Sequence, residues 1–149
     1  MNTSKFRPEL MHISITNCMR SECPLAHHCL RYLDYVHSER FVARVFLDPR
    51  GETGEVCSYH LPDTVVAMAR GFKRAIRSVR HGEVNALRIH LSHTLGCCKS
   101  IYYEYANGRT ALTPKQQELV RKVFSQYDVV DKELFDSYEE GYILSNQST

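Results

Sequence analysis

The chain has 149 residues, of which 43% are hydrophobic, and a formal net charge of +2. This length fits one domain with an ordinary core, and the small charge does not by itself indicate a polyanionic partner. No run approaches the roughly 20 apolar residues that span a bilayer, and residues 1–8 lack the apolar core of a secretion signal. We therefore expect a cytoplasmic protein with no membrane partner.

The elements expected along the chain give a single α+β domain over residues 1–149. Its first part, residues 1–60, is expected to be a cysteine-rich, metal-pinned lobe. Alternating and apolar stretches predict short strands at residues 11–15 and 41–47, with a helix over residues 24–36 between them. The second part, residues 61–149, is expected to be a helical lobe around a β-hairpin.

Two helices are predicted at the start of the second lobe. Apolar residues at helical spacing, on one face, predict a helix over residues 65–80: Val65, Met68, Phe72, Ile76 and Val79. A second helix is predicted over residues 83–95, and Gly96 suits the left-handed position that ends it. Together they form a helical hairpin or a helix-turn-helix.

The remainder of the second lobe is predicted to hold a hairpin and two more helices. Aromatic and β-branched residues from Lys99 to Ala106, followed by Asn107-Gly108, are typical of a β-hairpin that returns through residues 109–112. Thr113, Pro114 and Gln116 then form a capping box that opens a helix burying Leu119, Val120, Val123 and Phe124. A last short helix is expected to bury Leu134, Phe135 and Tyr138.

Four cysteines form the main candidate site: Cys18, Cys23, Cys29 and Cys57. In a reducing compartment, cysteines at this low density are metal ligands or free thiols, and four thiolates form the closed tetrahedral shell of structural zinc. Three alternatives remain open at this point. The thiols are simply buried or free, a histidine (His27, His28 or His60) replaces one cysteine, or the four cysteines hold an iron–sulfur cluster.

The chain also resembles a family of short, uncharacterised bacterial proteins that share a domain of unknown function. The likeness rests on the C-x4-C-P-x4-C-L-R run from Cys18 to Arg31 and on scattered later matches: Cys57, Tyr59, Ala69–Phe72, Tyr102-Tyr103, Gly108, Leu112–Pro114, Gln117, Phe135-Asp136 and Tyr138. The resemblance implies that the same four cysteines are the ligand set, and it leaves Cys97 and Cys98 outside the pattern. It implies no activity.

A basic surface is the second candidate site. On the predicted helix over residues 65–80, the basic residues lie opposite the apolar stripe, with no acidic residue between Thr64 and Gly82: Arg70, Lys73, Arg74, Arg77 and Arg80. A plain solvated face is one interpretation, and contact with nucleic-acid backbone, anionic lipid or an acidic protein surface is another. Helices followed by a hairpin also match the order of a winged-helix module, although this order alone is weak evidence.

Enzymatic function is not predicted. His90, His93 and Cys97 allow a second metal site or an activated thiol, but packing of Cys97 and Cys98 at a helix-to-strand corner is the favoured interpretation. The sequence has no phosphate-cradling glycine loop, nucleophile elbow or convincing carboxylate pair, and it identifies no small-molecule substrate. It therefore predicts a small intracellular structural-zinc protein that acts as a regulatory or accessory nucleic-acid-binding module. The alternatives are an iron–sulfur protein or a protein-interaction module.

Overall fold

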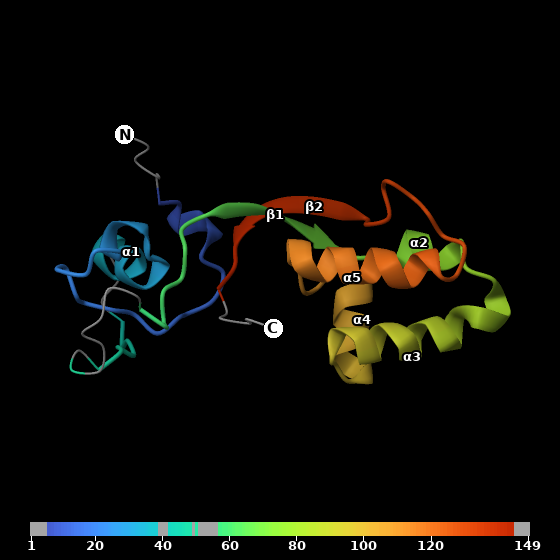
Figure 1. The fold of residues 1–149 in the computed structure, drawn as a ribbon, viewed down its shortest axis with the longest axis horizontal. Coiled ribbons are helices and arrows are strands. Elements are labelled where there is room, and N and C mark those ends of the chain that lie inside the picture. Colours follow the sequence, from blue (N-terminus) through green and yellow to red (C-terminus); the bar gives the residue numbers. More distant parts are fainter. Residues whose placement is uncertain (1–5, 39–41, 49, 51–56, 145–149) are drawn as a thin grey trace. The chain divides into compact units, whose positions relative to one another are not determined.

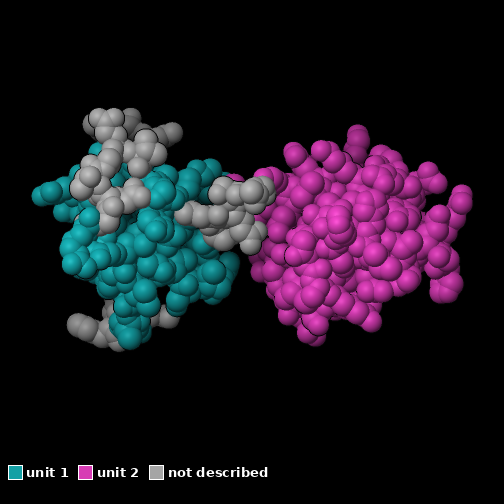
Figure 2. Space-filling view, turned by 60° about the horizontal axis from the view of Figure 1, so that its bottom comes forward, with its two compact units in different colours: residues 1–65, 141–149 teal, residues 66–140 magenta. Residues whose placement is uncertain are grey.

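The computed structural model describes residues 6–38, 42–48, 50 and 57–144. By internal contacts the chain divides into two compact units, coloured separately in Figure 2. The first unit combines residues 1–65 with residues 141–149, and the second comprises residues 66–140. The chain therefore leaves the first unit once and returns to it near the C-terminal end.

In its described residues the first unit contains two 3₁₀ turns and one helix: η1 (Pro8–Leu10), η2 (Ala26–His28) and α1 (Leu30–His37). Its buried core consists of Leu10, Leu30, Leu61 and Tyr142, which come from well-separated parts of the chain. The backbone N–H of Arg7 donates to the hydroxyl of Tyr142 at 2.9 Å. The returning segment thus helps to close the core of this unit.

Two predicted strands of the first unit are wrong within the described residues. Residues 11–15 form no strand, and residues 42–47 contribute only a parallel bridge between Asn17 and Phe46. Ile13 and Val45 are 60% and 70% exposed, and Met11 and Ile15 are only partly buried against the core, so neither segment has a fully buried face. Without a buried face, nothing favours a longer ladder. Phe41 lies outside the described residues.

The second unit packs helices around one apolar core. Figure 1 shows its helices and the two strands through which the chain enters and leaves it. In chain order these elements are β1 (Val65–Arg70), α2 (Lys73–Arg77), η3 (His81–Glu83), α3 (Val84–Leu95), α4 (Lys99–Ala106), α5 (Pro114–Ser125) and β2 (Ser137–Tyr142). α3 packs against α5. Phe72, Phe124 and Phe135 are buried in the apolar core of the second unit, and the Phe72 ring lies edge-on to the Phe124 ring. Every helix in the described ranges is too short or too polar for a membrane span.

The predicted helix over residues 65–80 is wrong. Residues 65–70 are strand β1, which pairs antiparallel with β2 in a two-stranded sheet. The chain then turns at Gly71, whose φ of +73° is left-handed, before the short helix α2. The carboxylate of Asp136 accepts hydrogen bonds from the backbone N–H groups of Lys73 (3.0 Å) and Arg74 (3.2 Å), and so closes the N-terminus of α2.

The predicted hairpin over residues 99–112 is also wrong. Residues 99–106 form helix α4, which buries Tyr102 and Ala106 one turn apart. The backbone N–H of Asn107 donates to the Tyr103 carbonyl at 2.9 Å, so Asn107-Gly108 ends a helix and does not join two strands. Burial of the aromatic face outweighs the β-propensity of these residues. Of residues 109–112, only Leu112 pairs with β1, at Ala69.

Two of the helix predictions are confirmed. α3 ends at Gly96, which has a left-handed φ of 63°, and α5 opens with the complete capping box of Thr113 and Gln116. The predicted last helix is wrong, because residues 137–142 form β2 and Tyr138 is exposed, while Leu134 and Phe135 are buried as expected. The fold is therefore α+β, as predicted, although its strands come from unexpected parts of the chain.

Candidate metal site

The four predicted cysteines line one small cavity in the first unit. The cavity has a volume of about 20 Å³ and is also bordered by apolar side chains such as Leu25, Ala26 and Leu47. This volume has room for roughly one water molecule or one ion. Cys29 is buried, and the other three cysteines are partly buried. All six cysteines of the chain are free thiols.

Backbone hydrogen bonds bring three separate segments to this cavity. The N–H of Cys18 donates to the carbonyl of Arg31 at 3.1 Å, which fixes the first cysteine beside the first turn of α1. The N–H of Leu30 donates to the carbonyl of Leu61 at 2.8 Å, which fixes the segment after Cys57 beside the same turn. Residues far apart in the sequence therefore meet at the start of α1.

The side chain of Arg31 ties the same three segments together. Its Nε donates to the carbonyl oxygen of Tyr59 and its Nη1 to the carbonyl oxygen of Thr16, both at 2.8 Å. The Arg31 guanidinium therefore links α1 to both neighbouring segments.

Tight turns set the direction of two of the cysteines. The N–H of Ala26 donates to the carbonyl of Cys23 at 3.0 Å, and the N–H of His60 donates to the carbonyl of Cys57 at 3.2 Å. Cys29 is the N-cap residue of α1. The sequence places Cys23 at a helix start, but only the short 3₁₀ turn η2 follows it.

The thiols surround the cavity without converging on a single point. Within the described ranges, no group of three or more His, Cys, Asp or Glu side chains is arranged to hold a metal ion. The four cysteines nevertheless share the walls of one cavity. The donor set therefore matches zinc in the kind of its side chains, whereas its arrangement in the described residues is not that of a metal site.

Only one of the three candidate histidines lines the cavity. His60 borders it, and its Nδ1 is buried without a hydrogen-bond partner among the described residues. His28 Nδ1 lies 3.5 Å from a carboxylate oxygen of Asp63, and the His27 ring lies edge-on to Tyr32. Sequence alone gives no reason to prefer His60, because its role depends on the turn that it forms with Cys57.

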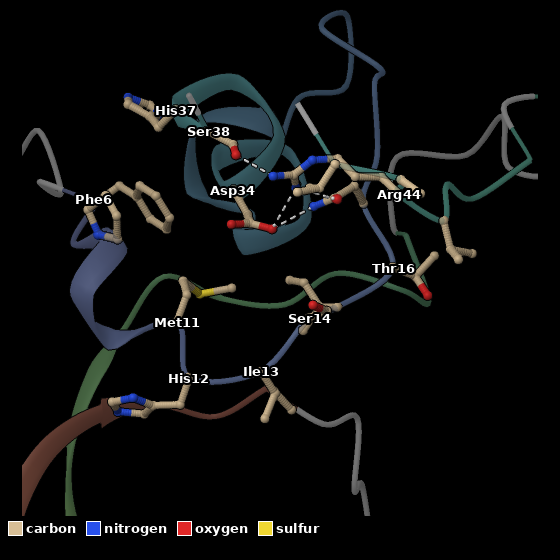
Figure 3. A pocket seen from close by; sticks show the side chains of 16 residues that line it. Phe6, Met11, His12, Ile13, Ser14, Thr16, Asp34, His37, Ser38 and Arg44 are labelled. Carbon is tan, nitrogen blue, oxygen red and sulfur yellow. Dashed lines mark hydrogen bonds and ion pairs between the residues drawn. The ribbon is translucent and has the colours of Figure 1, made fainter. Parts of the chain in front are cut away.

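A second hollow of about 880 Å³ lies elsewhere in the first unit, and Figure 3 shows the side chains that line it. Its polar wall is a network that the sequence does not signal. Asn17, 1% exposed, donates from Nδ2 to Asp34 Oδ2 at 2.9 Å and accepts at Oδ1 from Arg44 Nη1 at 2.8 Å. Arg44 also donates to Ser38 Oγ. Because these side chains are hydrogen-bonded to one another, the network acts as a structural brace that links α1 to the extended segments.

Two residues of the predicted basic surface, Arg70 and Arg74, are engaged in contacts within the protein. Arg70 Nε lies 2.7 Å from Glu139 Oε1, and its Nη1 donates to the carbonyl of Gly108 at 3.0 Å. Arg74 donates to the carbonyls of Glu133 and Phe135. The sequence has no acidic residue between Thr64 and Gly82, but the folded chain brings two acidic side chains to this region. They are Glu139 of β2 and Asp136, the residue before β2.

The histidines and vicinal cysteines of the second unit do not form a site among the described residues. His90 packs its ring against Tyr127 at a centroid distance of 6.1 Å. Burial, followed by the neighbouring Cys98, raises the pKa of the Cys97 thiol, which makes it less reactive than an ordinary cysteine. These observations favour packing at the end of α3.

Fold and site together define a small α+β protein with two compact units and a cysteine-lined cavity. A family of unknown function, DUF6078, matches residues 1–144. The chain therefore belongs to that family. Curated proteins and solved structures gave no match to the chain. The expected membership of a family of unknown function is confirmed, whereas the role of the cysteine motif within that family stays a prediction.

Proposed function

We propose that the first unit binds one metal ion of the zinc class, with Cys18, Cys23, Cys29 and Cys57 as ligands and a structural role. One observation carries the proposal: four thiols from three separate segments line the same small cavity. Protein interiors contain few hollows, so one that is shared by four thiols supports a ligand at this place. The ion would link all three segments directly.

Cavity size favours a single ion over an iron–sulfur cluster. A volume of about 20 Å³ suits one ion whose ligands are the surrounding thiolates, whereas a cluster adds several iron and sulfide atoms. Zinc is the divalent ion most often held by four cysteines. The iron–sulfur alternative therefore requires a much larger rearrangement of the cavity.

A structural role follows from the proposed ligand count. Four protein ligands close a tetrahedral shell and leave no position for substrate or water, which distinguishes structural from catalytic zinc. Free thiols at all six cysteines agree with a reducing compartment, so the proposal places the protein in the cytoplasm. Within the proposal, the ion contributes directly to the folding free energy of the first unit.

Nucleic-acid contact stays a prediction and now rests on fewer residues. Lys73 and Arg77 have exposed side chains on α2, one turn apart, and Arg80 is exposed just after this helix. Arg70 and Arg74 are engaged within the fold. Three exposed charges support weak, sequence-independent contact with phosphates at most. An acidic protein surface is the alternative partner for the same residues.

Native mass spectrometry tests the metal proposal. Protein purified anaerobically without chelator is expected to carry the mass of one zinc ion, and that mass is expected to disappear after chelation and return with added zinc. A mass matching iron and sulfide would support the cluster instead. A zinc-free mass that persists after zinc is added to the reduced protein would reject metal binding at this cavity.

A further inference from the structure

His60 lines the cavity, and one nitrogen of its ring has no hydrogen-bond partner among the described residues. Nδ1 of His60 is buried and lacks a hydrogen-bond partner in the described part of the chain. The turn closed by the 3.2 Å hydrogen bond from His60 N–H to Cys57 O holds this histidine and Cys57 together. Buried polar atoms of native proteins are nearly always paired, so an unpaired Nδ1 at a candidate site indicates a missing hydrogen-bond partner.

Charge explains what this nitrogen would do beside a bound ion. Four thiolates around a divalent cation leave a net charge near −2 in a small, partly apolar cavity. Two donors of Arg31, Nε and Nη1, already point at carbonyl oxygens. A further donor inside the cavity would therefore stabilise the thiolates, which accept hydrogen bonds from groups around the metal.

We propose that Nδ1–H of His60 donates a hydrogen bond to a cysteine thiolate of the metal site, which makes His60 a positioning residue of that site. The proposal rests on the proposed metal function. Four thiolates already complete a tetrahedral shell, so the histidine is not needed as a ligand. Its proton must then lie on Nδ1, with the lone pair on Nε2.

Three variants separate this role from the alternatives. His60→Phe removes the donor and keeps a ring, whereas His60→Asn keeps an N–H close to the position of Nδ1. His28→Phe is the matched control, because His28 is an exposed histidine of the same unit that lies outside the cavity lining. Zinc affinity is measured for each by competition with a chromophoric chelator.

The expected result is a selective loss. Loss of a hydrogen bond to a metal ligand typically lowers metal affinity by about 10- to 100-fold, so His60→Phe should fall by that factor. His60→Asn should recover most of the affinity, and His28→Phe should match the wild type. The ¹¹³Cd resonance of the cadmium-loaded protein should stay in the four-sulfur range for all of them.

Other results would overturn the proposal in distinguishable ways. Equal affinity for His60→Phe and wild type would remove His60 from the site, and a ¹¹³Cd resonance typical of three sulfurs and one nitrogen in the wild type would make His60 a ligand. If His60→Phe does not fold, the ¹⁵N spectrum of the wild-type zinc form decides, because an unprotonated Nδ1 contradicts the proposal. Wild-type protein that binds no zinc would instead reject the metal function itself.

Discussion

The guanidinium of Arg31 donates to the carbonyl oxygen of Tyr59 at 2.8 Å and thereby fastens the start of α1 to the turn between Cys57 and His60. This contact explains how a cysteine 28 residues beyond Cys29 reaches the same cavity. The cavity is thus built by hydrogen bonds before any metal is considered. A bound ion would reinforce an arrangement that the protein already has.

Cys23→Ser is expected to abolish zinc binding and to unfold the first unit selectively. Removing one thiolate opens the shell, and structural zinc contributes on the order of 10 kcal/mol to folding in small zinc domains. The matched control is Cys98→Ser, because Cys98 is exposed in the second unit and lies outside the cavity. Zinc content and amide hydrogen exchange measured for both variants check this, and equal zinc loss would mean that other cysteines bind the metal.

Gly71→Ala is expected to destabilise the second unit by about 1–3 kcal/mol. Gly71 has a φ of +73°, and an added Cβ would lie 2.6 Å from the Asp136 carboxylate oxygen that closes the N-terminus of α2. Gly82→Ala is the control, because its Cβ would meet no atom within 4 Å and its φ is not left-handed. Urea unfolding measures both, and equal stability of the two variants would contradict the role given to Gly71.

Alkaline pH is expected to destabilise the second unit through Tyr102. Burial, followed by the neighbouring Tyr103, raises the pKa of Tyr102 to about 12. An unfolded tyrosine ionises near pH 10, so between about pH 10 and 12 the unfolded state loses its proton first and stability falls by about 1.4 kcal/mol per pH unit. Below pH 10 this contribution is fully present.

Tyr102→Phe isolates this contribution from the lysines and other tyrosines that titrate in the same range. The variant lacks the ionisable group, so its stability should fall less steeply than that of the wild type above pH 10. Urea unfolding at pH 8 and pH 11 gives the comparison. Parallel losses of stability in the two proteins would show that Tyr102 ionises as readily in the folded state as in the unfolded state.

Nucleic-acid binding, if present, is expected to depend on Lys73 and Arg77. Replacing both with alanine should weaken retardation of DNA or RNA at low salt and reduce the slope of log affinity against log salt by roughly 1.8 for duplex DNA. Lys115→Ala with Lys122→Ala removes the same charge from exposed positions of α5 and should have a smaller effect. No retardation by the wild-type protein would favour a protein partner or a solvated surface.

Local signals in the sequence predict the helices that begin or end at specific residues. Thr113 and Gln116 satisfy each other across one turn, and Gly96 accepts the left-handed conformation that ends α3. Each of these features depends on residues within a few positions. The sequence pattern is therefore enough to place α3 and α5.

Contacts between distant parts of the chain explain the main errors in the secondary structure predicted from the sequence. Val65 and Met68 lie at helical spacing, but β1 is fixed by β2, which is about 70 residues away in the chain. Tyr102 and Ala106 pack on one helical face although their neighbourhood favours strands. The polar brace of Asn17, Asp34 and Arg44 likewise depends on contacts that no short motif encodes.

X-ray absorption at the zinc edge tests the central claim most directly, because it reports the atoms bound to the metal. The measurement uses the full chain, reduced and loaded with one equivalent of zinc. Our account predicts one shell of four sulfur atoms at about 2.3 Å. A shell made only of nitrogen or oxygen at about 2.0 Å, or failure of the chain to retain zinc, would contradict it.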